Sequence, residues 1–167
     1  MRSMTPVALA EYDEQPFRFT ATAKLDADPI AVFAELGDMS LWFPLMRRSV
    51  WKTGATSGVG AEREVEVATF GKFRERMLAW EPGERVAFTM TGTTSPLMAR
   101  MAEDWRVSRD DGIYTRIDWI VVGKTTLLGR AVQPALRGIL RMIFMRGCGN
   151  LQKRAGTFKR EHAKQPA

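Results

Sequence analysis

Three charged residues, Arg63, Glu75 and Glu103, are the strongest candidates for chemistry in this chain of 167 residues. Each lies in a segment with the alternating pattern of a β-strand, on the strand face that otherwise carries apolar side chains. A carboxylate among apolar neighbours is costly unless it is paired, hydrogen-bonded or wetted. We therefore expect these residues at a wet rim, in a structural ion pair, or as polar contacts for a ligand in an apolar pocket.

Glu75 and Glu103 are also candidates for general acid–base catalysis, because burial raises the pKa of a carboxyl group towards neutrality. Arg154 is predicted on the inner face of a C-terminal helix, where it could reach such an acid. These residues leave open whether the protein is an enzyme.

Other kinds of catalytic site lack the residues they need. His162 is the single histidine and follows the last apolar helical positions, so no histidine-based triad is expected. Cys148 is the single cysteine, which excludes an intramolecular disulfide and favours a structural thiol. No histidine pair or cysteine cluster offers metal ligands, so we expect neither a metal nor a cofactor.

Length and composition indicate one globular domain, over residues 15–162, between a flexible tail at 1–14 and a short tail at 163–167. No leader-like segment or long apolar run is present, which favours a cytoplasmic location. The net charge is +6, and lysine and arginine are denser after residue 130. No nucleic-acid motif accompanies this charge, so solubility or contact with an anionic surface explains it better than nucleic acid.

The elements that must hold the candidate residues follow from periodicity and turn signals. Asp28-Pro29 predicts the start of a short helix that ends at Gly37, and a second helical turn is expected at 39–42. A strand over 17–25 precedes these helices. The expected strands after them span residues 48–53, 61–69, 72–80, 85–91, 98–109 and 113–122.

The turns between these strands predict a register. A three-residue turn "FGK" would place Val67 opposite Glu75, and a four-residue turn "EPGE" would place Met77 opposite Phe88 and Ala79 opposite Val86. A turn at "DDG" would place Trp105 opposite Ile117 and Glu103 opposite Trp119. The apolar positions then share one face across five strands, which supports this face as the inner one.

The last third of the chain predicts one long helix over residues 134–160. Its apolar stripe consists of Leu136, Leu140, Ile143, Phe144, Gly147, Leu151 and Phe158. Met142 and Met145 fall outside the stripe, among Arg137, Arg141, Arg146 and Lys153. This basic helix is a candidate for peripheral contact with a membrane or with a partner subunit.

The order of one strand, two short helices, six strands and a long helix resembles the START-like (SRPBCC, Bet v 1-like) helix-grip superfamily. Within it, the chain is most similar to the polyketide cyclase/dehydrase-like proteins. The segments that carry this resemblance are "DPIAVFAELGDMSLWFP", "GVGAEREVEV", "LAWEPGERVAFTMTG" and "WRVSRDDGIYTRIDWIVV". The resemblance implies an α+β fold, with a curved seven-stranded antiparallel sheet wrapped around the C-terminal helix.

The resemblance also implies a cavity between sheet and helix for an apolar small molecule. We expect the ligand to contact Phe33, Trp42, Arg63, Val65, Glu75, Met77, Phe88, Met90, Glu103, Trp105, Trp119, Leu140 and Phe144. The first functional hypothesis is binding of a lipid, a quinone or a polyketide-like molecule by a monomer or homodimer. The alternatives are a cyclase, aromatase or dehydratase that uses a cavity carboxylate, and a module that delivers lipid or quinone at a membrane surface.

Overall fold

A computed structural model of the chain describes residues 1–54, 57–110 and 114–163, with residues 157–163 described by their backbone alone. The elements are β1 (Arg2–Ser3), η1 (Leu9–Glu14), β2 (Phe17–Leu25), α1 (Pro29–Leu36), η2 (Met39–Leu41), β3 (Met46–Trp51), β4 (Glu62–Val67), β5 (Gly71–Glu81), β6 (Arg85–Thr93), β7 (Met98–Asp110), β8 (Tyr114–Thr125), α2 (Leu127–Ala131) and α3 (Gln133–Ala163).

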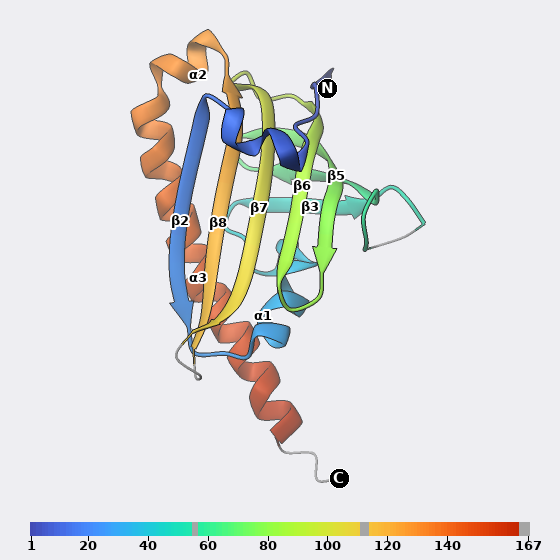
Figure 1. The fold of residues 1–167 in the computed structure, drawn as a ribbon, viewed down its shortest axis with the longest axis vertical. Helices are drawn as coiled ribbons and strands as arrows, with labels where there is room; N and C mark the ends of the chain where they lie inside the picture. Colours follow the sequence, from blue (N-terminus) through green and yellow to red (C-terminus); the bar gives the residue numbers. More distant parts are fainter. Residues whose placement is uncertain (55–56, 111–113, 164–167) are drawn as a thin grey trace.

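The sheet is antiparallel and wraps around α3, which confirms the predicted α+β helix-grip fold (Figure 1). Its strand order is β2-β8-β7-β6-β5-β4-β3, and these are the seven expected strands. The short strand β1 pairs with β6 and adds an eighth strand that the sequence pattern did not indicate.

The two short helices after β2 form as predicted. The carboxylate of Asp28 caps α1 by accepting the backbone N–H of Ile30 at 2.9 Å, and Pro29 occupies the first helical turn. Phe33 and Leu36 lie on the buried face of α1. Asp38 caps η2 in the same way through Ser40.

The predicted register of the β4–β5 hairpin is wrong by four residues. Glu75 lies opposite Arg63, and Val67 lies opposite Gly71, because the turn consists of residues 68–70. Thr69 and Gly71 adopt left-handed φ angles of 73° and 101°, which makes this earlier turn. A shift by an even number of residues keeps every side chain on its predicted face.

The other two hairpins show the same kind of correction. Met77 lies opposite Phe88 as predicted, but a bulge then places Ala79 opposite Ala87 in place of Val86. In the β7–β8 hairpin the predicted pairs are displaced by two residues, so that Trp105 faces Trp119 and Glu103 faces Val121. Asp110 pairs with Tyr114, and the connecting residues 111–113 lie outside the described residues.

The N-terminal segment 1–14 is packed, and the prediction of a flexible tail there is wrong. It crosses the face of the sheet that is turned away from α3 (Figure 1). Val7 is fully buried, and its backbone N–H donates to the Thr89 hydroxyl at 2.8 Å. With Tyr12 it covers apolar outer-face residues of β7 and β8, such as Ala102 and Ile120, which would otherwise face water. Of the expected C-terminal tail, the described part is Ala163, which ends α3.

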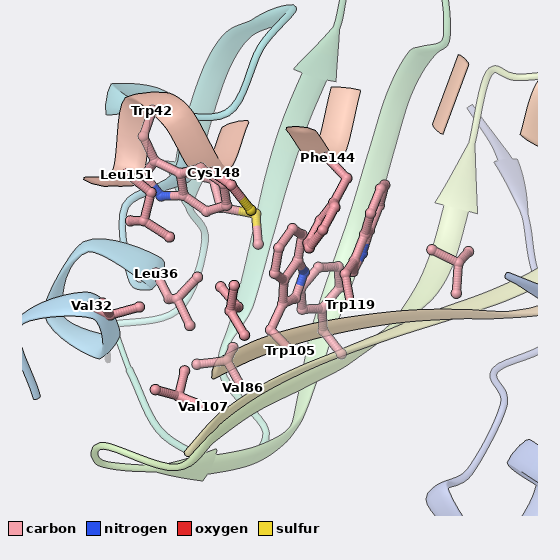
Figure 2. Packing of buried hydrophobic residues seen from close by; sticks show 14 of the residues in the cluster. Val32, Leu36, Trp42, Val86, Trp105, Val107, Trp119, Phe144, Cys148 and Leu151 are labelled. Carbon is pink, nitrogen blue, oxygen red and sulfur yellow. The ribbon is translucent and has the colours of Figure 1, made fainter. Parts of the chain in front are cut away.

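The long helix α3 presents its predicted stripe to the sheet. Leu136, Leu140, Ile143, Phe144, Gly147 and Leu151 are buried, whereas the side chain of Phe158 lies outside the described residues. Figure 2 shows Phe144, Cys148 and Leu151 of α3 packed with Trp42, Trp105 and Trp119. Met142 and Met145 are exposed on the opposite side of α3, as predicted.

Candidate ligand-binding site

A cavity lies between the inner face of the sheet and the N-terminal half of α3. Its empty volume is about 730 Å³ with the open mouth included, and about 70 Å³ of this accepts the centres of water-sized molecules. Glu75, Ser95 and Glu103 are the polar residues of a lining that is otherwise apolar. The full lining is Phe17, Met39, Phe43, Met46, Val67, Phe70, Phe73, Glu75, Phe88, Met90, Ser95, Leu97, Met98, Met101, Glu103, Trp119, Val121, Leu136, Leu140 and Ile143.

The residues predicted to contact a ligand separate into two groups. Those that line the cavity are Glu75, Phe88, Met90, Glu103, Trp119 and Leu140. Those in the packed core beside it are Phe33, Trp42, Arg63, Val65, Met77, Trp105 and Phe144. A role in ligand contact stays a prediction for both groups, and the first group has direct access to the cavity.

An aromatic cluster closes the inner end of the cavity. The rings of Trp105 and Trp119 stack with centroids 4.9 Å apart, and Phe144 stacks on Trp119 at 6.1 Å. Trp42 meets Trp105 edge-on at 5.4 Å, and Figure 2 shows these rings side by side. Such contacts add stability beyond the area they bury. The sequence pattern did not show whether this part of the interior is empty or packed. In the structure, indole and phenyl rings fill it.

Glu103 lies at the junction of this cluster and the cavity. The indole N–H groups of Trp119 and Trp105 both donate to its Oε2 atom, at 2.8 Å and 3.3 Å. Among the described residues no donor reaches the other oxygen, Oε1, and Glu103 lines the cavity. The two indoles thus hold the carboxyl group in one orientation while leaving one oxygen for other contacts.

The pKa of Glu103 is raised to about 7, mainly by burial and then by the negative charge of Glu75. The indole hydrogen bonds and the charge of Arg63 act in the opposite direction and lower this pKa. A carboxyl group in such surroundings changes its charge near neutral pH. The group can therefore accept a hydrogen bond when ionised and donate one when protonated.

Arg63 and Glu75 form a buried ion pair beside Glu103. They lie directly opposite each other on β4 and β5, and Nε of Arg63 donates to Oε2 of Glu75 at 2.5 Å. The guanidinium group also lies over the rings of Phe88 and Trp51, at 5.1 Å and 5.4 Å. Burial raises the pKa of Glu75, and Arg63 opposes this rise.

Arg154 does not reach the cavity acids. Its guanidinium group pairs with Glu35 of α1. Arg154 lies in the C-terminal half of α3, beyond the turns of this helix that line the cavity. The sequence did not predict Glu35 as the partner. It stands next to the buried Leu36, and a helix as short as α1 does not indicate clearly which way Glu35 faces. The pair fastens α3 to α1.

The remaining chemical candidates have structural surroundings. Cys148 is buried, and burial raises the pKa of its thiol to about 12, so the reactive thiolate is scarce at neutral pH. The side chain of His162 lies outside the described residues. Over the described part of the chain, no three acidic, histidine or cysteine side chains gather where they could hold a metal ion.

The sequence did not predict several lining residues, because they lie in turns or at the ends of strands. Phe70, Ser95 and Leu97 belong to connections whose course the pattern does not predict. The high methionine content of the chain indicated some of these lining residues. Ten are present in the chain, and five of them line the cavity, namely Met39, Met46, Met90, Met98 and Met101.

Comparison with known proteins covers most of the chain, from just before β2 into α3. The family model described as polyketide cyclase / dehydrase and lipid transport matches residues 16–156. The chain belongs to this family. The matched residues include every residue of the cavity lining. No curated protein sequence matches the chain.

Solved structures confirm the START-like helix-grip fold of the chain. A hypothetical protein from Helicobacter pylori has a TM-score of 0.72 and 13% identity, over 93% of this chain and 99% of its own. A START superfamily protein from Mycobacterium smegmatis has a TM-score of 0.68 and 10% identity, over 84% and 98%. The Zhui aromatase/cyclase from Streptomyces sp. R1128 has a TM-score of 0.61 and 16% identity, over 83% and 90%. At such identities the likeness shows the fold alone.

Among the described residues, no helix is long and apolar enough to cross a membrane.

Proposed function

We propose that this protein binds one small, largely apolar molecule in the cavity between the sheet and α3. The observation that carries this proposal is the lining itself, which is apolar except at Glu75, Ser95 and Glu103. An apolar pocket with a few convergent polar groups is the usual form of a small-molecule site. Location in the cytoplasm and a monomeric or homodimeric state stay predictions from the sequence.

The cavity has little free space in this structure. The space that accepts water-sized molecules is about 70 Å³, small beside the whole empty volume of about 730 Å³. A bulky ligand would therefore have to displace side chains. The five methionines of the lining suit this, because methionine is unbranched and adapts to irregular contents at low cost. A lipid chain, a quinone or a polyketide-like aromatic would fit this description.

Glu103 is the polar contact that we expect to orient the ligand. Its Oε2 atom is occupied by the two indoles, so Oε1 is the atom offered to the cavity. In the ionised form it would accept a hydrogen bond from a ligand hydroxyl or amine. In the protonated form it would donate to a ligand carbonyl.

An enzymatic function is the second candidate, and the surroundings of Glu103 favour it. A pKa of about 7 is suited to a group that takes up and releases a proton at neutral pH. The Zhui neighbour is described as an aromatase/cyclase, which makes proton transfer on a polyketide-like substrate a reasonable extension for this chain. The choice between binding and catalysis depends on whether Glu103 changes the chemistry of a bound molecule.

The proposal is tested by native mass spectrometry of the full chain, followed by extraction and identification of bound molecules. Glu103→Gln then separates the two functions, since glutamine can still accept the indole hydrogen bonds but does not exchange a proton. A binding protein would keep the extracted molecule unchanged in the variant, with at most about a tenfold loss of affinity. An enzyme would bind it and lose the rate of conversion. A wild-type protein that takes up no molecule from panels of lipids, quinones and aromatic polyketides would contradict both.

A further inference from the structure

A set of exposed apolar side chains lies on α2 and the first half of α3. Leu127 is 84% exposed and Leu128 is 52% exposed, although leucines are normally buried. Val132, Ile139, Met142 and Met145 continue the same set of exposed apolar side chains along the chain. Ile139, Met142 and Met145 are spaced by three residues, so they share one side of α3. We call these six residues, with Arg130, Arg141 and Arg146, the α2–α3 face.

The segment of the chain that carries this face has charges of one sign only. Residues 119–160 contain nine lysines and arginines and no aspartate or glutamate. Arg130, Arg141 and Arg146 are exposed, and no carboxylate among the described residues pairs with them. Several arginines on the outer face of the sheet differ, because they pair with neighbouring acids, as Arg74 does with Glu64. The α2–α3 face therefore presents apolar groups among unneutralised cations.

The face also lies next to residues that line the cavity. Thr126, which caps α2, donates its backbone N–H to the carbonyl of Leu97 at 3.0 Å and its hydroxyl to the carbonyl of Pro96 at 2.7 Å. Leu97 and the neighbouring Ser95 line the cavity. In α3, the buried Leu136, Leu140 and Ile143 line the cavity within the same turns that carry the exposed residues. Figure 1 shows α2 at the end of α3 where β2 begins, which is the end where Phe17 enters the lining.

We propose that the α2–α3 face docks on the surface of a lipid bilayer that contains anionic lipids. Leu127 and Leu128 would enter the boundary between headgroups and acyl chains, while the arginines contact lipid phosphates. Docking in this orientation brings the end of the cavity beside Leu97 close to the bilayer, from which we expect an apolar ligand to enter without crossing water. This inference goes beyond ligand binding, because it concerns where the ligand is exchanged.

A bilayer fits the face better than an acidic protein does. Two adjacent leucines on a short projecting helix require an apolar medium around them, which a fluid acyl layer supplies without a matched pocket. The α2–α3 face also contains no tryptophan or tyrosine, the residues that most often anchor protein interfaces. Basic residues beside an exposed apolar helix face are the usual composition of a segment that lies on an anionic membrane.

The test is sedimentation of the full chain with vesicles of phosphatidylcholine alone or of phosphatidylcholine with phosphatidylglycerol. The wild-type protein should bind the anionic vesicles, and this binding should weaken as salt is raised. Leu127→Ser with Leu128→Ser should weaken it by at least about tenfold. Arg141→Glu with Arg146→Glu should weaken it by a similar factor of at least about tenfold and remove the salt dependence.

Two matched controls make the outcome specific. Ile30→Ser with Val59→Ser removes two exposed apolar residues from other parts of the surface. Arg18→Glu with Arg74→Glu makes the same change in net charge on the outer face of the sheet, where both arginines are about half exposed. Both controls should bind like the wild-type protein.

The proposal is overturned if the wild-type protein does not bind anionic vesicles at low salt. This includes the case in which it binds an acidic protein but not the vesicles. Equal losses in the face variants and in their controls would also overturn it. Uptake of the molecule identified by native mass spectrometry, offered in detergent solution, separates the docking proposal from the ligand-binding proposal. A variant that loses vesicle binding but keeps this uptake is impaired in docking alone.

Discussion

The indole N–H of Trp119 donates to the carboxyl group of Glu103 across 2.8 Å, and both side chains lie inside the core. The two residues come from adjacent strands, and Trp105 adds a second indole donor to the same oxygen. The arrangement fixes the orientation of an acid whose pKa is about 7. Glu103 thus lies between the packed aromatic cluster and the cavity. Its titration should make the stability of the folded protein depend on pH.

Glu103 should make the folded protein less stable as pH rises from about 5 to about 8. Its pKa rises from 4.5 to about 7 on folding, so between these values the folded state holds a proton that the unfolded state has released. Stability from this group is therefore present at low pH and is lost as pH passes through the folded pKa. The full effect is on the order of 3 kcal/mol.

Urea unfolding of the wild-type protein and of Glu103→Gln at several pH values isolates this group, because all other titrations are shared. The difference between their free energies of unfolding should shift in favour of Glu103→Gln as the pH rises. A difference that stays constant from pH 5 to pH 8 would mean that Glu103 does not change its charge in this range.

The buried pair of Arg63 and Glu75 should show strong coupling. Arg63→Met leaves a buried carboxylate without its partner, and Glu75→Leu leaves a buried guanidinium group, so each should lower the free energy of unfolding by about 3–5 kcal/mol. The double variant removes both charges and should lose much less than the sum of the two. Denaturant melts of the four proteins give this coupling energy, and simple additivity of the two losses would show that the pair has no special role.

Two helical glycines should respond in opposite directions to alanine. A Cβ atom at Gly129 of α2 would lie 2.0 Å from the carbonyl oxygen of Leu97, so Gly129→Ala must push α2 away from Leu97, which lines the cavity. We expect a loss of about 1–3 kcal/mol. Gly138 of α3 has open space at this position, and Gly138→Ala should raise stability by up to about 1 kcal/mol. Thermal melts of both variants measure the two effects, and equal shifts would contradict the close packing of α2.

Which face each strand turns inward could be predicted from the sequence, because it depends only on alternation. Glu75 and Glu103 face the interior although their predicted partners were wrong by four and by two residues. Register depends on the number of residues in a turn, and the left-handed conformation of Thr69 is not evident from its residue type. The cross-strand contact of Arg63 with Glu75 therefore required the structure.

The extent of the cavity could not be predicted for a different reason. Trp105 and Phe144 have the same pattern as Trp119 and Leu140, yet the first two pack in the aromatic cluster and the latter two line open space. That distinction depends on how large rings fill the volume between sheet and helix, and residue type alone does not determine it. The packed N-terminal segment was missed because its 3-10 helix and its two-residue strand have no periodicity to detect.

The most direct test of the account is to fill the cavity and measure its occupancy. Leu140 lines the cavity, whereas its neighbour Ile139 is exposed, so Leu140→Trp adds a ring inside the cavity and Ile139→Trp adds the same ring at the surface of α3. Leu136→Trp, also in the lining, serves as a second cavity variant, and occupancy is compared among variants that keep the wild-type circular dichroism spectrum and a cooperative melt. We predict that native mass spectrometry finds the bound molecule in the wild-type protein and in Ile139→Trp, and finds it lost from both cavity variants. Equal occupancy in all four proteins would contradict a ligand site between the sheet and α3.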